Sequence, residues 1–188
     1  MSALAPLMSS ARQDWETPPE LLERVRRVGR IGLDPCASRT GVVKARTEWY
    51  GPPTEDDGLA NRWAPSLRRG DLAWCNPPFS SLATWVDKAI SEWTGMCLAA
   101  DDPALPAACC APGSAIVLLS PARTDTRWFV RLVEHARAIC FLSGRLTFLG
   151  APNPAPFPTA VTLLGGPAMG GRFAEAFAGA GWMHARSM

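Results

Sequence analysis

Apolar residues recur along the chain at two different spacings, and each spacing predicts a different kind of element. Leu21, Leu22, Val25 and Val28 share one face of a short helix that Gly29 would end. Residues 80–95 repeat this spacing and predict a longer helix, closed by Gly95. Short runs of consecutive apolar residues at 31–33, 71–75 and 115–119 predict buried strands instead.

The C-terminal third continues the alternation. The pattern predicts a helix from about residue 126, two late strands within 138–150 and 159–166, and a last helix within 171–185. Ser143 and Gly144 interrupt the first late strand, which indicates a hairpin or a bulge. Alternating helices and strands predict an α/β fold with an open, mostly parallel sheet, helices on both faces and an antiparallel C-terminal strand pair.

Length and composition indicate one domain. The chain has 188 residues, of which 47% are hydrophobic and 19% charged, which is ordinary for a globular protein. Residues 1–13 are expected to be a disordered leader, and the Pro- and Ala-rich stretch 96–113 a surface insertion. No apolar run is long enough to span a membrane, and no signal peptide precedes the domain, so we expect a cytoplasmic protein with no membrane partner.

Cysteine spacing and net charge exclude few classes of function. The six cysteines form no CxxC pair and both histidines lie far from them, which predicts reduced thiols and no metal; a zinc site at Cys109 and Cys110 is the alternative. The net charge of +2 neither requires nor excludes a polyanionic partner. Four arginines lie together at positions 24–30, either as a solvated helix face or as contacts for phosphate.

Polar turns follow three of the predicted strands. They occupy residues 34–38, 76–79 and 120–125. Ligands of open α/β sheets bind outside the carboxyl ends of the strands. We therefore expect the three turns to converge on one cleft.

The second turn, Asn76-Pro77-Pro78-Phe79, has a specific chemical use. Asn76 offers a side-chain carbonyl, Pro77 a backbone carbonyl in a direction fixed by its ring, and Phe79 a flat apolar face. Two acceptors and a stacking surface suit a planar ring that bears an amino group. Such an amine is a poor nucleophile, and acceptors that bind its hydrogens free its lone pair for attack. The structural alternative is a stiff strand-to-helix turn capped by Ser80 or Ser81.

The turn resembles the (D/N)PP(Y/F) signature of methyltransferases that act on the exocyclic amine of adenine in DNA. Further segments, in the same order, are similar to phage-type DNA N-6-adenine methyltransferases between residue 14 and about residue 164: DWETPPELL, LDPCAS, KARTEWY, DDGLANRW, WCNPPFS, WVDKA, VLLSPARTDTRWF, ICFLSGRLTF and APFP. The resemblance implies a Rossmann-like methyltransferase fold, S-adenosyl-L-methionine as cofactor and double-stranded DNA as partner. It further implies methyl transfer to adenine after the base has been flipped out of the duplex.

The resemblance also implies roles for individual residues. It assigns catalysis to Asn76, Pro77, Pro78 and Phe79, with Phe79 stacking on the target base. The positions that match cofactor-binding residues are Thr17, Pro18, Asp34, Pro35, Ala37, Asp57 and Asn76. Arg123 and Asp125 match a segment near the target nucleotide, although a local ion pair explains them equally well.

Two departures from the family pattern keep other functions open. No clear acidic residue ends a strand between Asp34 and Asp57, where the cofactor ribose would bind, and Glu48 is the nearest candidate. No separate target-recognition domain is visible apart from residues 96–113 and the C-terminal strands with Arg145. The alternatives are methylation of RNA adenine or of protein glutamine, or a non-catalytic protein that binds DNA as a decoy.

Overall fold

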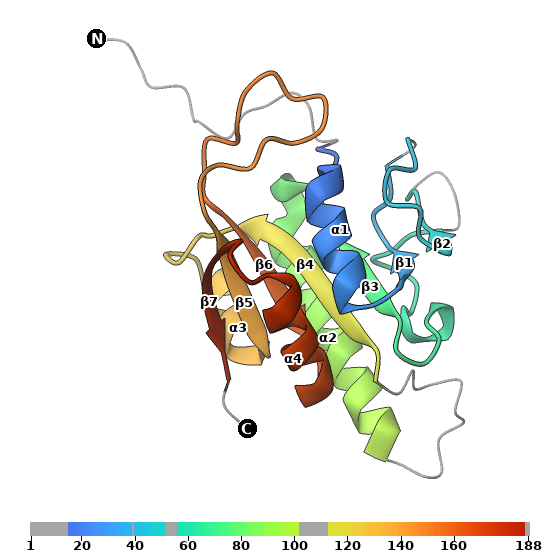
Figure 1. Cartoon of the computed structure of the whole chain (residues 1–188). Helices are drawn as coiled ribbons and strands as arrows, with labels where there is room; N and C mark the ends of the chain where they lie inside the picture. Colours follow the sequence, from blue (N-terminus) through green and yellow to red (C-terminus); the bar gives the residue numbers. More distant parts are fainter. Residues whose placement is uncertain (1–14, 39, 52–55, 102–112, 187–188) are drawn as a thin grey trace.

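The computed structural model describes residues 15–38, 40–51, 56–101 and 113–186, which form one seven-stranded sheet with helices on both sides (Figure 1). The elements in chain order are α1 Pro19–Val28, β1 Ile31–Asp34, β2 Thr47–Glu48, η1 Ala64–Ser66, β3 Leu72–Cys75, η2 Phe79–Ser81, α2 Leu82–Asp101, β4 Ala115–Pro121, α3 Arg127–His135, β5 Ala138–Leu142, β6 Thr159–Leu164, α4 Pro167–Ala176 and β7 Gly181–Ala185.

The sheet has a parallel half and an antiparallel half. Its strand order is β2-β1-β3-β4-β6-β5-β7, and the pairs within β2-β1-β3-β4 are parallel. The pairs β4–β6, β6–β5 and β5–β7 are antiparallel. Since β5 is antiparallel to β6, and β6 to β4, β5 runs in the same direction as β4. Most strands therefore share one direction, while β6 and β7 oppose it.

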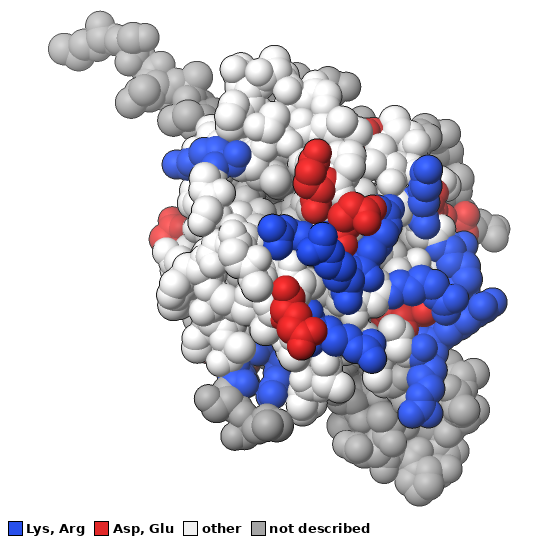
Figure 2. All heavy atoms as spheres, in the orientation of Figure 1, with Lys and Arg blue, Asp and Glu red and all other residues white. Residues whose placement is uncertain are grey.

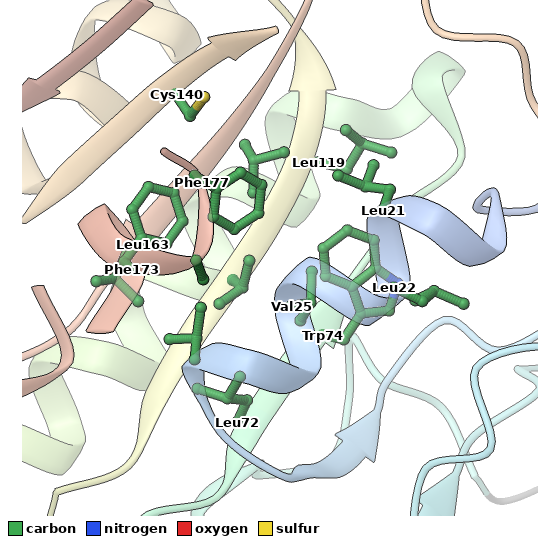
Figure 3. Close-up of a cluster of buried hydrophobic side chains, with 14 of the residues drawn as sticks. Leu21, Leu22, Val25, Leu72, Trp74, Leu119, Cys140, Leu163, Phe173 and Phe177 are labelled. Atoms are coloured by element: carbon green, nitrogen blue, oxygen red, sulfur yellow. The ribbon is translucent and has the colours of Figure 1, made fainter. Parts of the chain in front are cut away.

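Two apolar cores lie on the two faces of the sheet. On one face, α1 and α4 pack against each other and on the sheet. Figure 3 shows Leu22 and Val25 of α1 near Trp74 of β3 on one side of this core, and Phe173 of α4 with Phe177, the residue after α4, on the other. The opposite face is covered by α2 and α3, which bury another set of residues. Consecutive residues of β1, β3, β4 and β6 are all buried because both of their faces are covered.

The elements with strong apolar patterns lie where the sequence predicts them. Helices α1 and α3 and strands β1, β3 and β4 agree with prediction to within a few residues, and β5 and β6 form the expected antiparallel pair. The apolar face of α1 is buried, as its spacing requires. The predicted leader, residues 1–13, lies outside the described part of the chain, as do Cys109 and Cys110.

Two predictions about elements are wrong, and a third, the last helix, is right only in its first half. Gly95 does not close α2, which continues to Asp101, so residues 96–101 of the predicted insertion are helical. Residues 102–112 of that stretch lie outside the described residues. The last segment contains a helix and then a strand, β7, because the apolar face of α4 ends at Phe177 and Gly179 turns the chain back toward β5. Strand β5 ends at Leu142, so Ser143 and Gly144 begin a loop and interrupt no strand.

The order of the strands fixes where a ligand cleft forms. The chain leaves β1 toward β2 on one side, whereas it leaves β3 toward β4 on the other. The two connections diverge at the carboxyl ends of β1 and β3, which is the point where open α/β sheets hold their ligands.

Candidate functional site

A cavity of about 380 Å³ lies at this divergence point. It is lined by the turn after β1, the turn after β3, the segment before α1 and the loop after β2; the lining residues that sequence analysis singled out are Thr17, Asp34, Pro35, Ala37, Asp57, Asn76 and Pro78. This volume suits a ligand of cofactor size.

The turn after β1 is held rigidly. The backbone N–H of Cys36 donates to the Asp34 carboxylate (3.1 Å), and the N–H of Ala37 donates to the carbonyl of Trp49 (2.9 Å). Trp49 in turn donates its N–H to the carbonyl of Asp34 (2.9 Å), so the ends of β1 and β2 are tied together. The turn is therefore already shaped before any ligand enters.

Asp34 is the most unusual ionisable group of this site. Its side chain is 3% exposed, and it lies opposite Glu48 in the β1–β2 register. Burial raises the pKa of the Asp34 carboxyl to about 7, against the lowering effect of the Cys36 N–H and with a smaller rise caused by the negative charge of Glu48. A carboxylate in this state is stabilised by a cation brought into the cavity.

Asn76 links the turn after β3 to the segment before α1. Its amide nitrogen Nδ2 donates to the backbone carbonyl of Trp15 (2.6 Å) and to the hydroxyl of Thr17 (3.2 Å). Both amide hydrogens are thereby used, which fixes the orientation of the side chain. The oxygen Oδ1 remains as the acceptor, on a side chain that lines the cavity.

The rest of the Asn76-Pro77-Pro78-Phe79 turn is stiff and partly aromatic. Pro77 is buried, and Pro78 precedes the short helix η2, whose Ser81 N–H donates to the Pro78 carbonyl (3.1 Å). The half-buried ring of Phe79 meets Phe148 and Phe157 edge-on, with ring centroids 6.0 and 5.4 Å apart. Phe79 does not contribute to the cavity lining, and its partners belong to the loop 143–158.

The loop that carries Asp57 is packed against the turn after β1. The Asp57 carboxylate accepts the N–H of Leu59 (2.8 Å), and a Cβ on Gly58 would lie 1.9 Å from the carbonyl oxygen of Pro35. The Gly58 carbonyl accepts the indole N–H of the fully buried Trp63 (2.7 Å). Glycine at position 58 therefore permits the close approach that brings Asp57 to the cavity.

Of the predicted site residues, Pro77 and Phe79 belong to the turn but do not line the cavity, and three others lie elsewhere. Pro18 is the N-cap residue of α1 and lines a separate hollow together with Arg24 and Arg145. Arg123 and Asp125 form the local ion pair that sequence analysis named as the alternative (3.4 Å), and the side chain of Asp125 is 71% exposed. Neither residue lines the cavity.

The structure adds residues that the sequence did not single out for the site. Glu16, Ser38, Tyr50 and Trp74 line the cavity. Glu48 ends β2 directly beside β1, and its carboxylate accepts the Ala45 N–H (3.0 Å) and the Tyr50 hydroxyl (2.7 Å). An acidic residue thus does end the neighbouring strand, but β2 has two residues and gives no periodic signal.

The cavity lining includes one cysteine, Cys36. Among the described residues, Cys36, Cys75 and Cys140 are free thiols, and no group of three or more His, Cys, Asp or Glu side chains is placed to hold a metal. No helix in the described part of the chain has the length and apolar character needed to cross a membrane.

Most of the arginine cluster is engaged within the protein. Arg24 donates to the Ala176 carbonyl (2.9 Å), Arg26 to the Glu23 carboxylate (2.6 Å) and Arg30 to the Asp71 carboxylate (2.8 Å). Lys and Arg side chains nevertheless gather over the α1 side of the face seen in Figure 2. Hydrogen bonds within the protein therefore account for three of the four arginines without a phosphate ligand.

Comparison with known proteins decides the family. The model of the family described as DNA N-6-adenine-methyltransferase (Dam) matches residues 5–98, which is half of the chain. The chain belongs to this family. No curated protein and no solved structure matches it.

The family match covers the part of the chain that forms the cavity. The matched residues 5–98 include the turns after β1 and β3, the loop that carries Asp57, and most of α2. The match does not extend to Arg123 and Asp125, nor to the antiparallel half of the sheet. Membership in the Dam family therefore rests on the half of the chain that surrounds the candidate site.

Proposed function

We propose that the protein transfers a methyl group from S-adenosyl-L-methionine to the exocyclic amine of adenine in double-stranded DNA, on a Rossmann-like methyltransferase fold. Its family consists of DNA N-6-adenine methyltransferases. The observation that carries the proposal is the orientation of Asn76: its amide nitrogen donates to Trp15 and Thr17, which leaves the side-chain oxygen as the acceptor on a residue that lines the same cavity as Asp34.

The cavity fits the cofactor in size and in chemistry. S-adenosyl-L-methionine carries a sulfonium and an ammonium group, and the acidic residues Glu16, Asp34 and Asp57 line the cavity. Asp34 gains most from a cation because it is buried. Thr17, Pro35 and Ala37 would border the cofactor, with Asp57 near its adenine ring. When bound, the cofactor supplies an electrophilic methyl group. Pro18, which lines another hollow, would act by starting α1.

The turn after β3 would activate the target amine. Asn76 Oδ1 and the Pro77 carbonyl would accept the two hydrogens of the adenine amine, which directs its lone pair toward the methyl group. The amine nitrogen would form its bond to the methyl carbon while the bond from that carbon to the sulfonium sulfur breaks, which would leave S-adenosyl-L-homocysteine. The methylated amine would then release one proton to water. Pro77 and Pro78 fix the direction of the acceptor because their rings lock the backbone. No strong base is needed for this step.

The base would reach this turn by leaving the duplex. A flipped adenine would lie on the half-buried ring of Phe79, which Phe148 and Phe157 hold in place by edge-on contacts. Arg123 and Asp125, at the end of β4, would lie toward the target strand; Asp125 is exposed. The basic side chains over α1 would favour approach of the phosphate backbone (Figure 2).

The test is a radiolabelled methyl-transfer assay. Unmethylated duplex DNA should accept the label, and restriction digestion of the product should locate the modified site. Asn76→Ala should lower turnover by at least about 100-fold, the size of loss known for removal of one preorganised hydrogen-bonding group from a catalytic site. Asn153→Ala, the same change at an exposed asparagine, should leave the rate unchanged. Turnover of Asn76→Ala at the wild-type rate would refute the role given to the turn.

The same assay separates the alternatives. Label in RNA or protein and none in DNA would favour methylation of RNA adenine or protein glutamine. DNA binding without cofactor consumption would favour a decoy. The decoy alternative depends on the lack of a strand-ending acidic residue between Asp34 and Asp57. In the structure Glu48 ends β2 beside Asp34, so this argument for a decoy is weakened.

A further inference from the structure

Strand β7 forms an open edge of the sheet. It is the last strand in the order and pairs with β5 on one side; no described strand pairs with its other side. Figure 1 shows it as the outermost strand. Edge strands normally carry charged residues or proline, which prevent further pairing. Residues 181–185 read Gly-Trp-Met-His-Ala and contain neither.

The hydrogen bonds at the two ends of the β5–β7 ladder show which backbone groups face outward. Arg186 donates its N–H to the Arg137 carbonyl (3.0 Å), and Ser143 donates to the Ala180 carbonyl (2.9 Å). Hydrogen-bonded pairs alternate along an antiparallel ladder, so even-numbered residues of β7 direct their backbone toward β5. Met183 and Ala185 therefore direct their N–H and C=O groups to the open edge.

The side chains of the even-numbered residues form an exposed apolar surface. Trp182 is 66% exposed, and its ring lies against His184 on the same strand, with centroids 6.4 Å apart. Both line a groove of about 400 Å³ with Phe141 and with Val130 of α3, which is 48% exposed. Trp182 and Val130 are two of the four exposed large hydrophobic side chains among the described residues.

We propose that two copies of the chain pair through β7, antiparallel about a two-fold axis at Met183. Met183 would then exchange both backbone hydrogen bonds with Met183 of the other copy, and Ala185 would pair with Gly181. This register uses the backbone groups that face outward. It also sets Trp182 directly opposite His184 of the other copy, in the closely spaced type of pair, so that four aromatic rings cover the two grooves.

The strand is self-complementary, which favours a second copy as the occupant. This register pairs the outward-facing N–H and C=O groups of both strands. It is also the one register that places Trp182 and His184 of each copy opposite His184 and Trp182 of the other. Because the two copies of β7 are antiparallel, the carboxyl ends of their parallel strands point in opposite directions. The two cavities would therefore open at opposite ends of one continuous sheet, and each would work separately.

A cysteine placed on the two-fold axis tests the register. Facing Cα atoms of a hydrogen-bonded pair lie about 5.5 Å apart, a separation that a disulfide spans. Met183→Cys should give a covalent dimer under mild oxidation that thiol reductant reverses. Ala185→Cys is the control on the same strand and face: its counterpart lies four residues away along the strand, roughly 13 Å, and should not cross-link. The native cysteines are present in both variants.

Mass measurement of the unmodified protein completes the test. Light scattering behind gel filtration should give twice the 20.2 kDa mass of the chain. Trp182→Lys, which puts a charge opposite His184, should give the single-chain mass with an unchanged circular-dichroism spectrum. A monomeric wild-type protein, or cross-linking that is equal in Met183→Cys and Ala185→Cys, would overturn the proposal.

Discussion

Asn76 connects the chemistry of the site to its assembly. An asparagine can offer one acceptor to a substrate while both of its amide hydrogens bind the protein, and here they bind the segment that precedes α1. An aspartate at this position would meet the Trp15 carbonyl at 2.6 Å with no hydrogen to donate. The choice of asparagine over aspartate in this chain thus follows from a neighbour that is distant in sequence.

Asp34 should make the stability of the free protein depend on pH. Its pKa is about 7 in the folded chain and far lower when unfolded, so between about pH 4 and pH 7 the folded state binds the extra proton. The contribution of Asp34 to stability therefore falls as pH rises through this window and stays low above it. Asparagine at position 34 can still accept the Cys36 N–H but carries no charge, so the variant does not lose stability in this way as the pH rises.

We accordingly expect Asp34→Asn to gain stability relative to wild type by about 2–4 kcal/mol between pH 5 and pH 8. Urea unfolding of both proteins at the two pH values measures the gain. Asp56→Asn, at an exposed position, should show no comparable dependence. If the unfolding free energies of wild type and Asp34→Asn differ by the same amount at pH 5 and pH 8, the raised pKa of Asp34 is contradicted.

Individual site residues are predictable from sequence when they follow a strand directly. Asp34 and Asn76 were located in this way, because a run of buried residues identifies the strand and its end. Tyr50 and Glu16 were not, since their position depends on how loops fold back over the sheet. The choice between an ion pair and a ligand contact at Arg123 also needed coordinates.

At the scale of elements, α2 shows how a glycine can mislead. Gly95 looks like a helix end, yet helical structure continues for six more residues. Its φ is not positive, and a Cβ at this position would meet no atom within 4 Å. Glycine here costs conformational entropy without a steric reason.

Gly95→Ala should therefore stabilise the protein by about 0.5–1 kcal/mol. Chemical unfolding monitored by circular dichroism measures the change. Gly144→Ala is the matched control: Gly144 also has open space around it but a φ of +74°, so alanine there should destabilise. A loss of stability in Gly95→Ala would mean that α2 ends near Gly95 after all.

Strands were predictable in proportion to their burial. β1, β3, β4 and β6 are buried on both faces and read as continuous apolar runs. β2 has two residues, and β7 is mostly exposed, so neither strand gives a run of buried apolar residues. The sequence therefore predicted the parallel core and its antiparallel pair, and missed both edges of the sheet.

At the scale of the whole molecule, the cavity is built by segments that are far apart in the chain. Residues before α1, after β1, after β2 and after β3 all line it, and Asn76 and Trp49 hold these segments to one another. A ligand that contacts all of these segments can bind the folded chain but not the unfolded chain. Binding should therefore stabilise the entire fold.

S-adenosyl-L-methionine at about 100 times its dissociation constant should add about 2.7 kcal/mol, which raises the melting temperature of a chain of this length by roughly 5–10 °C. The rise should be larger at pH 8 than at pH 6, since a cationic ligand favours ionised Asp34 and must otherwise displace its proton. ATP is the control, because it shares the adenosine group but its negative charge is repelled by Glu16, Asp34 and Asp57. Differential scanning fluorimetry makes the measurement. An equal response to both nucleotides would show that the acidic lining does not select the ligand, and no response to S-adenosyl-L-methionine would contradict the proposed cofactor.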